Sequence, residues 1–378
     1  MAARCNGLAR SYLDHASTSP ARPEAVQAML RWLSGPAAAD PARVHTEGRM
    51  ARAALEEARE QVAAFLGARP REVVFTSGAT EAVNAATWGA AALRPHGAVV
   101  AAAVEHSAVR DASERTGRLV TAPVDRLGRI DVDALLDLAV PGTALVHCQL
   151  GNHEVATVQP VAEVVAGCRE RGVPVHVDAA AAAGHVAIDF AALGADLLSV
   201  SAHKLGGPKG AGALLVRRGL RLPPLLVGGD QERARRAGME DVPAQVGFGA
   251  ACAGLDLAGE AEAARAATEA LAAAALTVPE VERFGDPDRR LPHILCLGIA
   301  GVEAEGVLLG LDQAGVAAHS GSACSSEALE PSPVLEAMGV AAERSLRLSV
   351  GWSTTAADVD AFAGAFPAVV ERLRALGR

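Results

Sequence analysis

The chain has 378 residues, of which 50% are hydrophobic, and its formal net charge at pH 7 is −9. This length is enough for two domains with a large core. The negative charge, without any basic cluster, excludes nucleic acid as a primary partner, because phosphate binding needs a basic face. No apolar run approaches the ~18 residues that span a bilayer, and no apolar signal core follows Met1. The six cysteines show no metal-binding spacing, so we expect reduced thiols, no metal site, no membrane partner and a cytoplasmic location.

The N-terminal part of the sequence predicts two helices, followed by a strand that runs into a third helix. We expect a helix over 23–33, and the helical spacing of apolar residues over 49–66 indicates an amphipathic surface helix. The apolar residues 73–75 lead into the small residues 76–80, which is typical of a strand joined to a helix N-terminus. The free N–H groups of such a junction bind anions. A capping box that ends on Glu81 fits the same residues.

Three further apolar runs predict buried strands over 98–104, 143–148 and 173–178. His106 follows the first strand and His153 follows the second, while Asp178 ends the third. A histidine that leaves a strand end is most often a satisfied structural side chain. An imidazole that titrates near neutrality also suits acid–base catalysis, so His106 is a candidate for that role.

The stretch from Leu198 to Val216 is typical of a strand, a tight glycine-rich loop and a second strand, with Lys204 in the loop. A buried lysine is costly unless it is paired or neutral. Burial and nearby cations lower its pKa, and the free amine can then attack an aldehyde. Ser201 and His203 could hold a phosphate beside it. A surface lysine in a turn is the alternative reading of the same residues.

Asp178 precedes Lys204 by 26 residues (204 − 178), and residues 188–196 between them form a plausible crossover. Two neighbouring parallel strands would then present an acid and a lysine at the same edge of a sheet, where open α/β sheets bind ligands. Pyridoxal 5′-phosphate (PLP) needs these two groups. The lysine engages its aldehyde, and the carboxylate keeps its pyridine nitrogen protonated.

The C-terminal part predicts one long helix over 248–276 that leads into a smaller domain, then a strand over 291–297 and a helix over 303–314. Cys324 is the only one of the six cysteines in a polar, glycine- and serine-rich loop. Arg347 lies in a predicted strand over 345–351. Its planar guanidinium suits a carboxylate, although a lone arginine in a strand is more often an edge residue.

The sequence resembles the cysteine desulfurases, a group of class V aminotransferases with PLP fold type I. The resemblance runs from about residue 12 to 351 and rests on the motifs YLD at 12–14, TSGATE at 76–81, EH at 105–106, HVDA at 176–179, SAHK at 201–204 and SGSAC at 320–324. It implies an α/β fold with a mostly parallel seven-stranded sheet flanked by helices, plus a smaller α+β domain. We expect a large PLP-binding domain at 13–255 and a small domain at 256–378 that includes residues 1–12.

The resemblance also implies the reaction and its residues. L-cysteine would be converted to L-alanine, with the sulfur passed as a persulfide to an acceptor protein of iron–sulfur cluster assembly or thio-modification, by a homodimer. The implied catalytic residues are Lys204, His106 and Cys324, and the implied substrate-binding residues are Asn152 and Arg347. The implied cofactor-binding residues are Ala79, Thr80, His106, His153, Asp178, Ser201, His203 and Lys204.

Three positions depart from the family pattern. His153 replaces an asparagine, and Ala181 replaces a glutamine that bonds to the phenolic oxygen of PLP, which His153 could reach instead. Met239 replaces a threonine that reaches the cofactor phosphate of the partner subunit, although Arg233 and Arg236 could still supply charge there. Two alternatives therefore stay open. One is another PLP lyase or transferase, such as a selenocysteine lyase, and the other is a catalytically impaired scaffold that binds proteins of a sulfur pathway.

Overall fold

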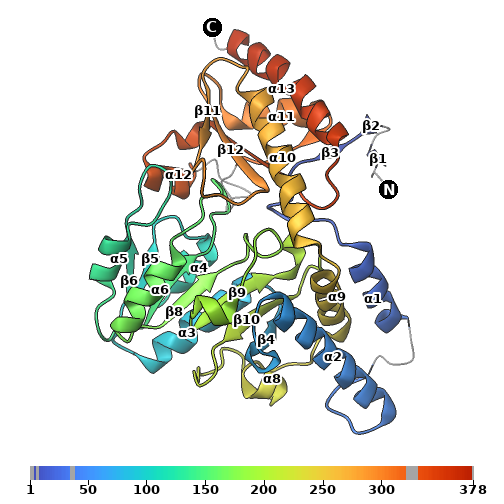
Figure 1. Ribbon diagram of the computed structural model, residues 1–378, viewed down its shortest axis with the longest axis vertical. Coiled ribbons are helices and arrows are strands. Elements are labelled where there is room, and N and C mark those ends of the chain that lie inside the picture. Colours follow the sequence, from blue (N-terminus) through green and yellow to red (C-terminus); the bar gives the residue numbers. More distant parts are fainter. Residues whose placement is uncertain (1–3, 6–7, 35–38, 321–330, 377–378) are drawn as a thin grey trace.

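The structure is a computed structural model that describes residues 4–5, 8–34, 39–320 and 331–376. A seven-stranded sheet lies at the centre of its larger part (Figure 1). In spatial order its strands are β4 (Val73–Thr76), β10 (Gly212–Val216), β9 (Leu197–Ser201), β8 (Val175–Asp178), β7 (Leu145–Gln149), β5 (Val99–Ala102) and β6 (Leu119–Ala122). β10 runs antiparallel to both of its neighbours, β4 and β9, and the other neighbouring strands pair in parallel. The predicted mostly parallel seven-stranded sheet is therefore confirmed.

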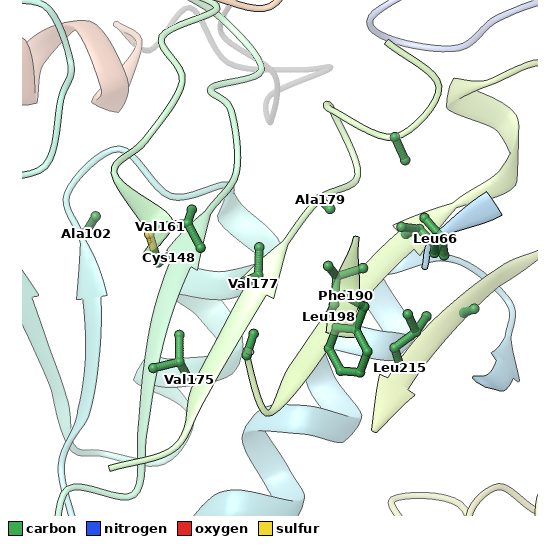
Figure 2. Packing of buried hydrophobic residues seen from close by; sticks show 14 of the residues in the cluster. Leu66, Ala102, Cys148, Val161, Val175, Val177, Ala179, Phe190, Leu198 and Leu215 are labelled. Atoms are coloured by element: carbon green, nitrogen blue, oxygen red, sulfur yellow. The ribbon is translucent and has the colours of Figure 1, made fainter. Parts of the chain in front are cut away.

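Helices cover this sheet, and every strand except β6 is buried at all its positions rather than at alternate ones. The helices are α1 (Pro23–Leu33), α2 (Thr46–Phe65), α3 (Ala79–Leu93), α4 (Ser107–Glu114), α5 (Val132–Leu138), α6 (Val161–Glu170), α7 (Phe190–Leu193), α8 (Gln231–Ala234) and α9 (Val242–Ala253). Figure 2 shows Val175, Val177, Leu198 and Leu215 on neighbouring strands, with Phe190 of α7 packed near Leu198. Burial of this apolar surface is the main stabilising contribution to the fold. None of the described helices is long and apolar enough to cross a membrane.

A smaller antiparallel sheet lies at the other end of the molecule (Figure 1). It contains β11 (Val281–Phe284), β12 (Ile294–Ile299) and β14 (Ser345–Ser349), which pack with α10 (Leu257–Ala275), α11 (Ala304–Gln313) and α13 (Ala356–Leu376) around a second hydrophobic core. Short elements complete the chain: β1 (Arg4–Cys5), β2 (Leu8–Ala9), β3 (Ser11–Tyr12), β13 (Val316–Ala317) and α12 (Pro333–Met338). Leu13 belongs to the second core. The division at residues 255 and 256 stays a prediction.

The single helix predicted over 248–276 is wrong, because the structure has two helices there, α9 and α10. The first ends before Gly254. Asp256 then starts the second helix by accepting a hydrogen bond from Gly259 N at 3.2 Å. An aspartate at this position satisfies an N–H group that has no partner within the helix. The alanine-rich composition on both sides conceals this break in the sequence.

Two buried histidines on neighbouring strands form a hydrogen-bonded pair that the sequence did not indicate. The Nδ1 atoms of His147 (β7) and His176 (β8) lie 2.9 Å apart, and His147 Nε2 lies 3.1 Å from Thr87 Oγ1 on α3. Thr87 donates its own proton to Val83 O at 2.8 Å. His147 Nε2–H must therefore donate to Thr87, and His176 Nδ1–H donates to His147. His176 Nε2 is left as an acceptor without a partner among the described residues.

The histidine pair predicts a loss of stability in acid. Burial lowers the pKa of His147 to about 3 and that of His176 well below its ordinary value. The unfolded chain binds these protons near pH 6.5, so stability is complete above that pH and falls as the pH is lowered from about 6.5 towards 3. Each histidine contributes at most about 1.4 kcal/mol per pH unit. Urea unfolding at about pH 7 and about pH 5.5 measures this dependence.

The matched variant is His147→Gln with His176→Leu. We expect its free energy of unfolding to change less between these two pH values than that of the unaltered chain, because two of the titrating groups have been removed. An equally steep dependence in the double variant would contradict the assignment.

Candidate active site

A cavity of about 490 Å³ opens at the edge of the large sheet where β8 and β9 end. Polar groups from separate parts of the sequence meet here because parallel strands carry their carboxyl ends to one edge. Nine of the predicted site residues line this cavity: Ala79, Thr80, His106, His153, Asp178, Ser201, His203, Lys204 and Arg347. The family's glutamine position, Ala181, lines it as well.

Lys204 ends a short 3-10 helix (Ala202–Lys204) that follows β9, and its Nζ donates a hydrogen bond to Ala16 O. Burial lowers the pKa of this amine to about 8. The positive charge of Arg347 acts in the same direction, while Asp14 and Asp178 oppose it. A lysine with such a pKa is partly neutral near neutrality, which is the form that attacks a carbonyl group.

Asp178 ends β8, and its Oδ1 accepts hydrogen bonds from Ala180 N at 2.9 Å and from Ser199 Oγ at 3.1 Å. Burial raises the pKa of Asp178, whereas these hydrogen bonds and the nearby His153 and Lys204 lower it. The lysine and the carboxyl group therefore share one cavity edge, as the strand spacing predicted.

A second buried carboxyl group, Glu105, lies close to Asp178 and was not among the predicted site residues. Burial, with the charge of Asp178, raises the pKa of Glu105 to about 8. Its Oε1 accepts a hydrogen bond from Gln149 N at 2.7 Å. Two nearby carboxyl groups in a dry site do not both ionise readily, so Glu105 is the neutral member near pH 7. The sequence signal that could have pointed to Glu105 was its position directly before His106.

His106 and His153 face each other edge to face across the cavity wall, with ring centroids 4.9 Å apart and an interplanar angle of 69°. His106 begins α4, and its Nδ1 accepts a hydrogen bond from Ala108 N at 3.1 Å. Burial lowers the pKa of His106 to about 3, and the neighbouring His153 and Lys204 contribute to this shift. The resting His106 is therefore neutral, with its proton on Nε2. This ring contact requires a histidine at position 153 and would be absent with the asparagine of the family pattern.

Asn152 lies behind the cavity wall rather than on it. Its Nδ2 donates to Val104 O at 3.1 Å, and its Oδ1 accepts from Glu154 N and Val155 N, both at 2.8 Å. Gln149 Nε2 donates to the same Val104 carbonyl at 2.7 Å. These bonds tie the loop that carries His106 to the turn that carries His153. The contact predicted between Asn152 and the substrate stays a prediction, since its amide is already engaged.

Arg347 is buried in β14 and reaches the cavity from the smaller sheet. Its Nη1 donates to His153 O at 3.0 Å, and its Nη2 donates to Asp14 Oδ1 at 2.9 Å and to Ser17 Oγ at 2.7 Å. Its Nε has no hydrogen-bond partner among the described residues. A cationic donor that is held rigidly in this way can bind an anionic group of a ligand.

The N-terminus of α3 also lines the cavity. Glu81 Oε2 accepts a hydrogen bond from Ser77 N at 2.8 Å, but the predicted capping box is wrong, because the N-cap residue is Gly78, which has no side chain to complete it. Arg236 binds the same carboxylate, with its Nε 2.9 Å from Oε1 and its Nη2 3.2 Å from Oε2. Arg233 lies 3.3 Å from Glu56, and Met239 is exposed. Arg233 and Arg236 are thus paired with carboxylates, whereas Arg235 donates to the backbone carbonyls of Glu232 and Val73.

Cys324 lies outside the described residues. The residues on either side of its segment are anchored near the cavity, because Ser345 Oγ donates to Ser320 O and Ser332 Oγ donates to Glu154 Oε2, both at 2.5 Å. The cysteines whose side chains the structure describes are all buried, and none lines the cavity. Burial raises the pKa of these thiols, which are Cys148, Cys168, Cys252 and Cys296.

The chain matches the family model of the class V aminotransferases over residues 11–362. It is 41% identical to a cysteine desulfurase of Trichormus azollae, with 97% of this chain and 94% of that protein covered. A solved NifS-like protein has a TM-score of 0.89 at 28% identity and covers 96% of this chain and 100% of its own. The solved SspA in complex with cysteine has a TM-score of 0.81 at 30% identity and covers 91% of this chain and 100% of its own.

The environment of Lys204 predicts how its amine titrates. In protein without cofactor, we expect the reactivity of Lys204 toward acetic anhydride to rise with pH around a midpoint of about 8, because burial and Arg347 favour the neutral amine. Competitive labelling followed by peptide mapping measures this midpoint. Arg347→Gln should move it upwards, since one opposing positive charge is removed. A midpoint near the ordinary lysine value of about 10.4 in the unaltered chain would contradict the prediction.

Proposed function

Because the chain belongs to the class V aminotransferases, and within them to the cysteine desulfurases, we propose that it uses PLP in this cavity to convert L-cysteine to L-alanine and to transfer the sulfur to Cys324. The observation that carries the proposal is the convergence of Lys204, Asp178, His106 and Arg347 on one cavity. A related protein, SspA, has been solved in complex with cysteine, which supports the substrate.

The residues of the cavity fit PLP in their chemistry. Lys204 offers an amine of lowered pKa for the aldehyde, and Asp178 offers a buried carboxylate for the pyridine nitrogen. The N–H groups at the start of α3, together with Ser201 and His203, suit a phosphate. Bound PLP would supply an electron sink for the substrate carbon.

The neutral state of Glu105 leaves Asp178 as the anion of the site, which is what a protonated pyridine nitrogen requires. We propose that His106 holds and moves a proton at Nε2, because its Nδ1 is occupied by a backbone N–H. Lys204 takes or returns a proton at the substrate carbon once its amine is free. Arg347 binds the substrate α-carboxylate, and the carbonyl of His153 with Asp14 and Ser17 orients its guanidinium.

Cys324 is the proposed sulfur acceptor within the chain. Its thiolate attacks the substrate sulfur, so that an S–S bond forms as the C–S bond breaks. The electron pair of the C–S bond stays with the substrate carbon, which is then protonated to give alanine. The described cysteines support this choice indirectly, because they are buried and their raised pKa values keep the thiols protonated. An acceptor protein would then take the sulfur from the persulfide.

A second copy of this chain is the proposed structural partner. Leu226, Val227 and Met239 are 41%, 78% and 63% exposed. The hydrogen bond from Ala237 N to Leu226 O, at 3.2 Å, holds their two segments together. These three exposed apolar side chains form the patch that we propose as the contact between the two copies. Met239, which departs from the family pattern, would lie in this contact.

The sulfur-transfer proposal predicts a separation of cofactor binding from turnover. Cys324→Ser should keep the absorbance of bound PLP and its change on addition of L-cysteine, but form alanine at less than about one hundredth of the normal rate, because no thiolate attacks the sulfur. Alanine is measured by amino-acid analysis and sulfide by a colorimetric assay. Cys252→Ser is the matched control and should keep its rate. Undiminished alanine formation by Cys324→Ser would exclude the role of Cys324.

The partner proposal predicts that a charge in the exposed patch weakens self-association. Light scattering at micromolar concentration should give the mass of a dimer. Val227→Asp should raise the dissociation constant at least about tenfold, because the new carboxylate would be desolvated in the contact. Leu376→Asp is the control, since Leu376 is 80% exposed but lies in α13 at the opposite end of the molecule from α8 (Figure 1). A monomeric mass for the unaltered chain would overturn the proposal.

A further inference from the structure

The chain has 35 lysines and arginines, and only two of them are lysines, Lys204 and Lys209. Both lysines line the same cavity. All the other long cationic side chains of the chain are arginines, including those that are exposed. An exposed cation without a function at position 209 would therefore be expected to be arginine as well. The composition therefore distinguishes Lys209 from the other exposed cations of the chain.

The backbone places Lys209 beside the start of α3. Lys209 and Gly210 form the turn before β10, and Gly212 at the start of β10 pairs with Thr76 of β4. The packing between Gly212 and Gly78 is so close that an added Cβ at position 212 would lie 2.6 Å from Gly78 Cα. The charge of Lys209 also contributes to the lowered pKa of His203, after burial and Lys204. Lys209 therefore lies at the end of the cavity formed by the helix N-terminus, Ser201 and His203.

Among the described side chains that line the cavity, the other cations are Lys204, which would engage the aldehyde, and Arg347, which binds Asp14. Arg236 binds Glu81, and Arg233 binds Glu56. His203 is neutral near pH 7, because burial and the two lysines lower its pKa to about 4. Lys209 has no carboxylate within 4.0 Å in the described part of the chain. A phosphate monoester carries about −1.5 to −2 charges at pH 7, so hydrogen bonds alone leave it poorly neutralised.

We propose that Lys209 binds the phosphate group of the cofactor and supplies the charge that this end of the cavity otherwise lacks. The inference rests on the proposed function. A lysine suits the position because its compact ammonium group sits on a flexible stem and can turn from the exposed rim onto a phosphate oxygen. Lysine binds phosphate as a point charge, whereas arginine needs a fixed two-oxygen geometry.

The test compares PLP with pyridoxal, which has the aldehyde and the ring but no phosphate. Cofactor-free protein is titrated with each compound, and dissociation constants are measured by absorbance. Lys209→Gln should weaken PLP binding about ten- to a hundredfold, the size expected for one charge-assisted hydrogen bond, and leave pyridoxal binding unchanged. Lys209→Arg should recover part of the loss. Arg221→Gln is the matched control, because it removes one exposed positive charge that does not line the cavity.

The outcomes separate this inference from the proposed function. If the unaltered chain binds neither compound, the proposed function itself is wrong. If the unaltered chain binds PLP, the inference is overturned by equal PLP affinity in Lys209→Gln, or by an equal loss for PLP and pyridoxal. The inference also predicts that inorganic phosphate competes with PLP less effectively in Lys209→Gln than in the control. Equal competition in both variants would contradict it.

Discussion

The site depends on the burial of an amine and a carboxyl group at one edge of a parallel sheet. Asp178 ends β8, and Lys204 follows the adjacent strand β9. The two strands are held in register by ladder hydrogen bonds, and Ser199 of β9 also donates to Asp178. Neither charge is well solvated, so each group responds to the other and to the local hydrogen bonds. A rigid sheet is what keeps two such groups at a fixed separation without forming a direct ion pair.

The surrounding residues decide which groups of the cavity are charged. Glu105 is buried close to Asp178 and remains neutral near pH 7, and His106 is neutral because it is buried near Lys204 and Arg347. Two amide side chains, one in the cavity wall and one behind it, maintain this arrangement. Gln149 and Asn152 converge on the carbonyl of Val104 and hold the turn of His153 against the loop of His106. The catalytic proposal therefore relies on Asn152, which does not line the cavity, and on Gln149, which does.

Arg347 connects the two sheets through the site. It belongs to the smaller sheet, yet its guanidinium binds the carbonyl of His153 in the larger part and Asp14 near the N-terminus. Any shift between the two sheets would move this cation relative to Lys204 and Asp178. The position at which a substrate carboxylate would bind therefore depends, through the buried side chain of Arg347, on how the two sheets pack against each other.

The sequence by itself determined the large sheet, the acid and lysine on neighbouring strands, and the family, because apolar runs, strand-end residues and motifs are local features. It also located the cysteine loop as a motif, whose Cys324 lies outside the described residues. The tertiary structure decided how Glu105 ionises, how His147 pairs with His176, and that the amide of Asn152 is engaged by Val104 O and two backbone N–H groups. These properties depend on desolvation and on contacts between distant segments, which no local pattern carries. The break between α9 and α10 escaped prediction for a related reason, since helix-favouring alanines surround the single capping aspartate, Asp256.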